Sequence, residues 1–82
     1  MNKFELTEDS IEFRGCTLFR IKALRSFSNV KKSDIGGFVE KESNLSQLGD
    51  AWIYENAKAS GDAVVSGDAI VDYEVSSGTV KD

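Results

Sequence analysis

The residues of this chain with the most chemical potential are carboxylates that recur at a regular spacing in its C-terminal half. Asp50, Asp62 and Asp68 each follow a glycine, and Asp72 and Glu74 come soon after them. Regularly spaced carboxylates can hold a cation, or form an acidic surface that attracts a basic partner. An Asp beside a Gly also stabilises a tight turn by accepting backbone N–H groups, and this structural role competes with both functional ones.

The sequence lacks the residues that most catalytic and metal-binding sites require. The chain contains no histidine and a single cysteine, Cys16, which excludes Ser-His-Asp and Cys-His arrangements and a zinc site of Cys and His. The phosphate-binding pattern GxxxxGK[ST] is also missing. Calcium needs only oxygen ligands, but the carboxylates recur every six residues, not every nine as in calcium-binding β-rolls. We therefore predict a protein that is not an enzyme and has no metal and no cofactor.

The carboxylates belong to a six-residue repeat that runs from Gly49 to Val75. The segment reads GDAWIY, ENAKAS, GDAVVS, GDAIVD and YEV. Small or branched apolar residues recur at one phase and again two residues later, as in a short strand whose alternate side chains point inward. The first series is Ala51, Ala57, Ala63, Ala69 and Val75, and the second is Ile53, Ala59, Val65 and Val71.

This period predicts an all-β fold, a short parallel β-helix (a β-solenoid) with triangular coils of about 18 residues. Pairs such as Gly-Asp turn the corners, because Gly adopts positive φ freely and Asx tolerates it. The phase extends back to Leu45 and Val39, so the repeat is expected to begin soon after Gly36-Gly37. The residues expected to stack are Asp50 under Asp68, Ala51 under Ala69, Ile53 under Val71, Asn56 under Glu74 and Ala57 under Val75.

The first third of the chain indicates a different structure, an N-terminal β-hairpin that caps the solenoid. Apolar and polar residues alternate from Phe4 to Phe13, Arg14-Gly15 resembles a turn, and a second strand is expected from Thr17 to Phe27. A helix over Thr17 to Ser26 is the competing interpretation. The end coil of a solenoid needs such a cap over its unpaired backbone and apolar interior. We expect a single domain over residues 1–82, with cap and linker in 1–34 and repeats in 35–80.

The hexad resembles that of the hexapeptide-repeat proteins, which form left-handed parallel β-helices. It follows the segments CTLFRIKAL at 16–24 and GGFVEKESNLSQ at 36–47 and begins with GDAWIYENA at 49–57, which makes the chain similar to bacteriophage and prophage proteins with GDA-type repeats. The resemblance implies a non-catalytic phage-type interaction protein, with inhibition of a host defence nuclease complex as one role. The alternatives are a self-assembling structural module and a degenerate acyltransferase-like hexapeptide protein without activity.

Charge and aromatic side chains indicate where a protein partner would bind. Residues 1–47 carry a net charge of +1 and residues 48–82 a net charge of −5, so the repeat disfavours nucleic acid and attracts a basic protein. Trp52 and Tyr54 flank the inward Ile53, which predicts outward anchors, with packing against the hairpin or a second subunit as the alternative. A basic group is interpreted as an ordinary solvated face because acids balance it nearby, with phosphate binding as the alternative; it consists of Arg20, Lys22, Arg25, Lys31 and Lys32. The predicted partner-binding residues are Trp52, Tyr54, Asp50, Asp62, Asp68, Asp72 and Glu74.

The small core of an 82-residue chain favours association. We expect a homo-oligomer, a dimer or trimer, whose contact uses Trp52, Tyr54 or the uncapped C-terminal end and avoids the acidic Asp50–Asp68 edge. No apolar run is long enough to span a bilayer, and the N-terminus lacks a signal-peptide pattern. The expected localisation is the cytoplasm, that of the host cell if the protein is phage-encoded, and no membrane or direct nucleic-acid binding is expected.

Overall fold

The structure, a computed structural model, describes residues 2–81 and is all-β. Within these residues there is no α-helix and no helix long and apolar enough to cross a membrane. The second predicted strand is therefore confirmed over its helical alternative. The elements are β1 (Phe4–Phe13), β2 (Cys16–Ala23), β3 (Ile35–Val39), the 3₁₀ helix η1 (Glu42–Asn44), β4 (Trp52–Ile53), β5 (Lys58–Ala59), β6 (Val64–Ser66), β7 (Ile70–Val71), β8 (Glu74–Val75) and β9 (Thr79–Lys81).

β1 and β2 form the predicted antiparallel hairpin, whose register runs from Phe4 opposite Ala23 to Phe13 opposite Cys16. Arg14 and Gly15 at its turn have φ values of 51° and 82°, the two positive angles of a type I′ hairpin turn. β2 ends before Phe27, because Phe27 instead pairs with Val30 across a short loop. The segment from Ser28 to Asp34 is expected to be a polar linker, but Val30 within it is buried, so it also contributes to the core.

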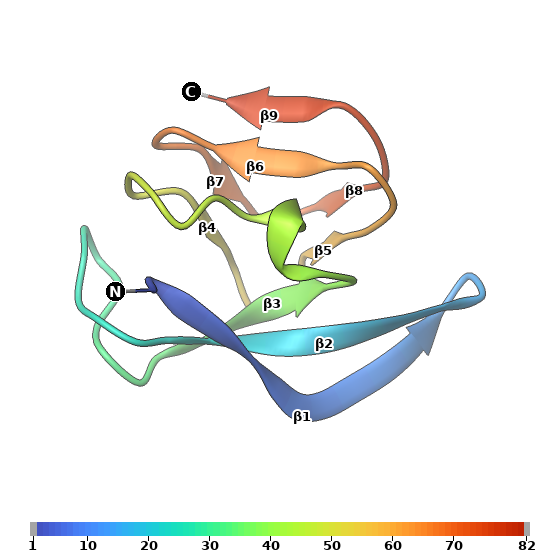
Figure 1. The fold of residues 1–82 in the computed structure, drawn as a ribbon, viewed down its shortest axis with the longest axis horizontal. Coiled ribbons are helices and arrows are strands. Elements are labelled where there is room, and N and C mark those ends of the chain that lie inside the picture. Colours follow the sequence, from blue (N-terminus) through green and yellow to red (C-terminus); the bar gives the residue numbers. More distant parts are fainter. Residues whose placement is uncertain (1, 82) are drawn as a thin grey trace.

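The hairpin covers the first repeats by extending their sheet rather than by lying across them. β2 pairs antiparallel with β3, which gives a mixed five-stranded sheet in the order β1-β2-β3-β5-β8. Figure 1 shows the hairpin below β3, at the opposite end of the molecule from β9. Phe4 and Phe27 enter the hydrophobic core. The first strand of the repeats is thus paired on both sides, which protects it from pairing with another chain.

The repeats stack through three ladders of parallel strands. β3, β5 and β8 form the parallel part of the mixed sheet, β4 pairs with β7, and β6 pairs with β9. Every residue of the two predicted inward series is buried, with at most 7% of its surface exposed. Gly49, Gly61 and Gly67 have φ values of 73°, 59° and 65°, so they turn the chain as the sequence predicted.

The spacing between stacked residues is not uniform, contrary to the prediction. Trp52 and Ile53 do stack on Ile70 and Val71, eighteen residues later. On the first ladder, however, Val39 lies beside Ala59, and Ala59 lies beside Val75. The spacing there falls from twenty residues to sixteen.

Two predicted stacking pairs, Ala57–Val75 and Asn56–Glu74, are therefore wrong. Lys58 lies beside Glu74 instead. The physical reason is the length of the corner: residues 54–57 separate β4 from β5, whereas only residues 72 and 73 separate β7 from β8. The six-residue pattern cannot reveal such a shortened corner, because Val75 remains at an inward, apolar position whether the corner is long or short.

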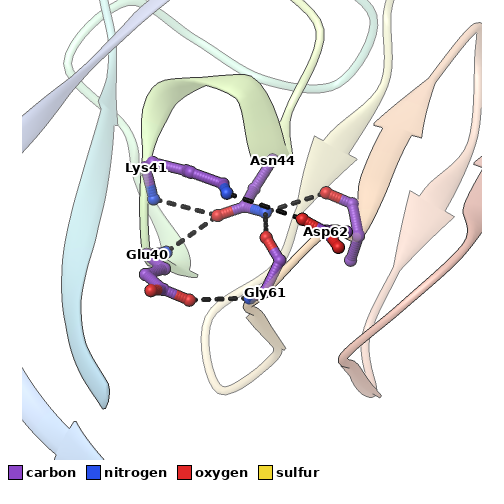
Figure 2. Close-up of polar contacts among 6 residues, drawn as sticks. Glu40, Lys41, Asn44, Gly61 and Asp62 are labelled. Atoms are coloured by element: carbon purple, nitrogen blue, oxygen red, sulfur yellow. Dashed lines mark hydrogen bonds and ion pairs between the residues drawn. The ribbon is translucent and has the colours of Figure 1, made fainter.

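A buried amide joins the corner at η1 to the corner before β6. Asn44 is fully buried, and its Oδ1 accepts hydrogen bonds from the backbone N–H groups of Glu40 (3.0 Å) and Lys41 (2.9 Å). Its Nδ2 donates to the carbonyls of Gly61 (3.2 Å) and Ala63 (2.8 Å). The Glu40 carboxylate also accepts the N–H of Gly61 at 2.7 Å (Figure 2). All four positions of the amide are used, so the two corners are locked in one register.

The glycine pair at the start of the repeats is required by close packing. A Cβ on Gly36 would lie 2.7 Å from the Trp52 ring and 2.8 Å from the Ile53 carbonyl. A Cβ on Gly37 would lie 2.5 Å from the carbonyl of Ala57. Because a side chain does not fit at these distances, β3 can approach β4 and the following corner only with glycine here.

The inward register can be tested with two adjacent substitutions. Ala63 is buried, whereas Val64 is only half-buried. We expect Ala63→Asp to lower the free energy of unfolding by roughly 2 kcal/mol or more, because it buries a carboxylate without a partner. Val64→Asp should lower it by about 1 kcal/mol or less. Thermal unfolding followed by circular dichroism compares the two variants, and equal melting temperatures would show that the register is wrong.

Candidate functional site

The five predicted acidic residues are exposed, but the structure distributes them over different sides of the molecule. Asp50 and Asp68 share one corner, because Gly49 packs directly against Gly67. Asp62 lies at the corner before β6, and Glu74 lies on β8. The structure therefore brings Asp50 and Asp68 together and separates the others from them.

Two of these acids already have basic neighbours within the chain. Arg14 Nη1 lies 3.1 Å from Glu74 Oε2, and Lys41 Nζ lies 3.9 Å from Asp62 Oδ1. Exposed pairs of this kind contribute only about 0–1 kcal/mol each, but the first one connects the hairpin turn to β8. A basic protein partner for the acidic corners stays a prediction.

The prediction that Trp52 is an exposed anchor is wrong. Its side chain is only 2% exposed, because the N-terminal part of the chain covers this face. Phe27 contacts it edge-on, with ring centres 5.3 Å apart and planes at 69°. Tyr54 is half-buried and packs against the core. Trp52 instead packs against the N-terminal region of the chain, as the alternative interpretation expected.

Two exposed apolar side chains in the last repeats escaped the sequence analysis. Ile70 is 61% exposed and Tyr73 is 51% exposed. Ile70 stacks on Trp52 in the parallel ladder, so it occupies the same outward phase one turn later, where Phe27 no longer covers it. The hexad contained this signal, since the outward apolar residue recurs eighteen residues after Trp52.

A hollow of about 250 Å³ opens on the hairpin, where its two strands fall out of register. Leu6 pairs with Ile21 and Ser10 pairs with Phe19, so three residues of β1, at 7–9, face Arg20 alone. The Thr7 hydroxyl donates to the Arg20 carbonyl at 2.9 Å and accepts the N–H of Asp9 at 3.2 Å. Such β-bulges redirect side chains and are frequent beside active sites.

The hollow combines both signs of charge with an apolar wall. It is lined by Asp9, Ser10, Ile11, Arg20 and Phe38. The guanidinium lies 4.3 Å from the centre of the Phe38 ring, a favourable cation–π distance.

Arg20 is held in place by the repeats. Its Nη1 donates to the carbonyl of Gly36 at 2.7 Å and lies 3.4 Å from that of Glu55. Arg20 is thus half-buried and structurally engaged, and its assignment to an ordinary solvated face is wrong. Alternation alone places Arg20 outward, but it does not report the bulge that opens the hollow.

Lys3 is a second unusual charge, and it is closed to solvent. Its side chain is fully buried, and its Nζ donates to the carbonyls of Ala51 at 2.7 Å and Gly49 at 3.4 Å. Burial, with a smaller contribution from Arg25 and against the effect of Asp50, lowers the pKa of Lys3 from 10.5 to about 8. Lys3 therefore fastens the N-terminus to the corner before β4 and is not accessible to a substrate.

This lysine predicts a pH dependence of stability. The folded-state pKa lies below the unfolded value of 10.5, so the unfolded chain binds more protons between about pH 8 and 10.5, and stability rises with pH across this window. Relative to Lys3→Met, the free energy of unfolding of the wild type should increase between these pH values. Urea unfolding at several pH values measures it, with the exposed Lys31→Met as control. A wild-type–Lys3→Met difference independent of pH would contradict the assignment.

Comparison with known proteins shows what this chain is similar to. No family model matches the chain. The chain is 36% identical over 76 residues to a protein of Escherichia coli (strain K12) named "Uncharacterized acetyltransferase YdcK", a match covering 82% of this chain and 23% of that protein. The chain thus spans less than a quarter of the length of this relative. The similarity loosely fits a hexapeptide-repeat protein, and a phage origin stays a prediction.

The prediction that the chain is not an enzyme is overturned by this similarity. The relative that matches most of the chain is named as an acetyltransferase. The missing histidine excludes a histidine base, but general bases also include Asp, Glu, Lys and Tyr. The lack of histidine therefore excludes particular catalytic arrangements and not catalysis as such.

Proposed function

We propose that the chain is an acyltransferase-like hexapeptide protein that serves the transfer of an acyl group from a thioester donor such as acetyl-CoA. The observation that carries this proposal is the 36% identity to a protein named as an acetyltransferase. Because the match covers 82% of the chain, it includes most of the repeat residues. The rest of the relative has no counterpart in this chain. The complete activity of the relative is therefore not assigned to this chain.

The proposal includes the finer architecture, in which the three ladders are the faces of a short parallel β-helix capped by the hairpin. Three features support it: parallel pairing on each face, two buried apolar series, and positive-φ glycines at the corners. A rigid parallel framework of this kind holds loops and side chains at fixed positions, which acyl transfer requires for close approach of donor and acceptor.

The chemistry needs a group that accepts a proton. In acyl transfer the acceptor atom attacks the thioester carbonyl carbon, the carbon–sulfur bond breaks, and the acceptor loses a proton. Since the chain has no histidine, a carboxylate is the natural base. Asp9 lines the hollow on the hairpin, where it is available for this role.

Acetyl-CoA turnover tests the proposal. The full chain is incubated with acetyl-CoA and a panel of primary amines and amino acids, and free CoA and acetylated product are separated by liquid chromatography. We expect product above the protein-free rate. At a temperature at which Ala63→Asp is unfolded and Val64→Asp is still folded, the first variant should be inactive and the second active, which ties the rate to the folded repeats. Product formation no faster than without protein, with every acceptor, would remove acyl transfer.

We also propose that a second copy of the chain covers the last repeats. β7 and β9 each pair with a neighbour on one side only, and β8 ends the mixed sheet, so within residues 2–81 these edges carry unpaired backbone groups. Ile70 and Tyr73 are exposed on the same turn. Pairing or packing there would bury apolar surface that the small core leaves uncovered.

Light scattering at micromolar concentration measures this association. We expect a mass of at least twice the 9.0 kDa of the chain. Ile70→Lys should shift the equilibrium toward monomer, because it places a charge in the contact. Ile35→Lys, at an exposed isoleucine on β3 (49% exposed), is the matched control and should leave the mass unchanged. A mass near 9.0 kDa that does not change on dilution would exclude the second copy.

A further inference from the structure

We propose that the hollow on the hairpin binds a small zwitterion, an α-amino carboxylate with an aliphatic side chain. Its carboxylate would lie against Arg20, its ammonium against Asp9, and its side chain against Ile11 and Phe38. The five lining residues and the volume of about 250 Å³ define the site.

Two opposite charges, Asp9 and Arg20, line one hollow without pairing. The ion pairs among residues 2–81 are Arg14–Glu74 and Lys41–Asp62, so Asp9 and Arg20 are more than 4 Å apart. At the bulge the Thr7 hydroxyl donates to the Arg20 carbonyl and accepts the Asp9 N–H, so both residues are fixed through their backbones while their charged side chains stay unpaired. A ligand that carries both charges satisfies both walls at once, and charge-assisted hydrogen bonds are the stronger class.

The position of the guanidinium is fixed before any ligand arrives. Stacking on Phe38 and hydrogen bonding to the Gly36 carbonyl hold it, with the Glu55 carbonyl at longer range. These contacts use Nη1, and within the described part of the chain Nη2 and Nε have no hydrogen-bond acceptor. Arg presents such N–H groups in a planar fork that matches a carboxylate.

The size and charge of the hollow favour a small ligand over a larger or more anionic one. Pockets for drug-sized molecules have about 300–1,000 Å³, so a hollow of about 250 Å³ fits a smaller molecule. A phosphate group would carry more than one negative charge beside the Asp9 carboxylate, which repels it. The apolar wall from Ile11 and Phe38 favours an aliphatic side chain over a polar one.

If the proposed acyl transfer holds, the bound amine is the acyl acceptor, and this step rests on that proposal. Asp9 takes one proton from the ammonium, and the neutral amine attacks the thioester carbonyl carbon. A carbon–nitrogen bond forms and the carbon–sulfur bond breaks. The leaving thiolate takes the second proton from nitrogen, and Asp9 releases its proton to water, so the products are the N-acyl amino acid and free CoA.

Amide NMR titrations with three probes test the binding. L-Leucine carries both charges, N-acetyl-L-leucine lacks the positive one, and L-leucinamide lacks the negative one. We expect leucine at millimolar concentration to shift the amides of residues 9–11 and 38. Each analogue should bind about tenfold more weakly. Unshifted amides in the hollow, or equal binding of leucine and either analogue, would overturn the proposal.

A pair of variants makes the test specific to the hollow. Asp9 is exposed, and Asp9→Asn keeps the backbone N–H that Thr7 holds, so the fold should remain, as an unchanged spectrum outside the hollow verifies. It should weaken leucine binding about tenfold. Glu5→Gln removes a charge from the same strand outside the hollow and should not affect binding. Equal affinity of Asp9→Asn and wild type would refute the role of Asp9.

The two proposals fail separately. Leucine binding in the hollow without acetyl-CoA turnover removes acyl transfer and leaves the amino-acid site. Turnover of acetyl-CoA while leucine leaves the hollow amides unshifted removes the amino-acid site and leaves acyl transfer.

Discussion

The buried amide of Asn44 is the interaction on which the stacking of the repeats depends. Several strands of the ladders contain only two or three residues, so each contributes few hydrogen bonds to the stacking. Asn44 corrects this, because two of its bonds go to its own corner and two to the corner before β6. An unsatisfied buried amide group costs about 1–3 kcal/mol, so any slip of one corner against the other is penalised.

With the register fixed, side-chain size determines how the molecule narrows. Near the hairpin the interior holds Phe4, Phe27 and Trp52, and stacked residues are twenty apart, as at Leu45 and Val65. Toward the C-terminus the interior holds mostly Ala and Val, and Val65 stacks on Val80 only fifteen residues later. Fewer residues per turn enclose a smaller cross-section, which small side chains fill without voids. The hairpin therefore supplies the bulk that the wide end needs.

The all-β class, the hairpin and the buried series could be predicted from the sequence because each follows from a local period of two or six residues. The exposure of Trp52 could not, since its cover, Phe27, lies 25 residues away and outside the repeat. The pairing of Val75 with Ala59 escaped for a different reason: a shortened corner changes the partner and leaves the apolar phase intact. The hollow could not be predicted, because an alternating pattern implies that each residue of one strand faces one residue of the other. At the bulge near Thr7, three residues of β1 face a single residue of β2.

Arg20 has a double role that links the candidate site to the fold. One side of its guanidinium reaches from β2 to the carbonyls of Gly36 and Glu55, so it connects the hairpin to both β3 and the corner after β4. Arg20 also lines the hollow. Any change at Arg20 therefore alters the junction of hairpin and repeats together with the charge of the hollow. Asp9 has no such second role, because its carboxylate makes no contact that supports the fold among the described residues. The Asp9 carboxylate makes no contact that stabilises the fold, whereas the Arg20 guanidinium is held in a fixed position by Gly36 and Phe38. This arrangement contributes more to ligand binding than to stability.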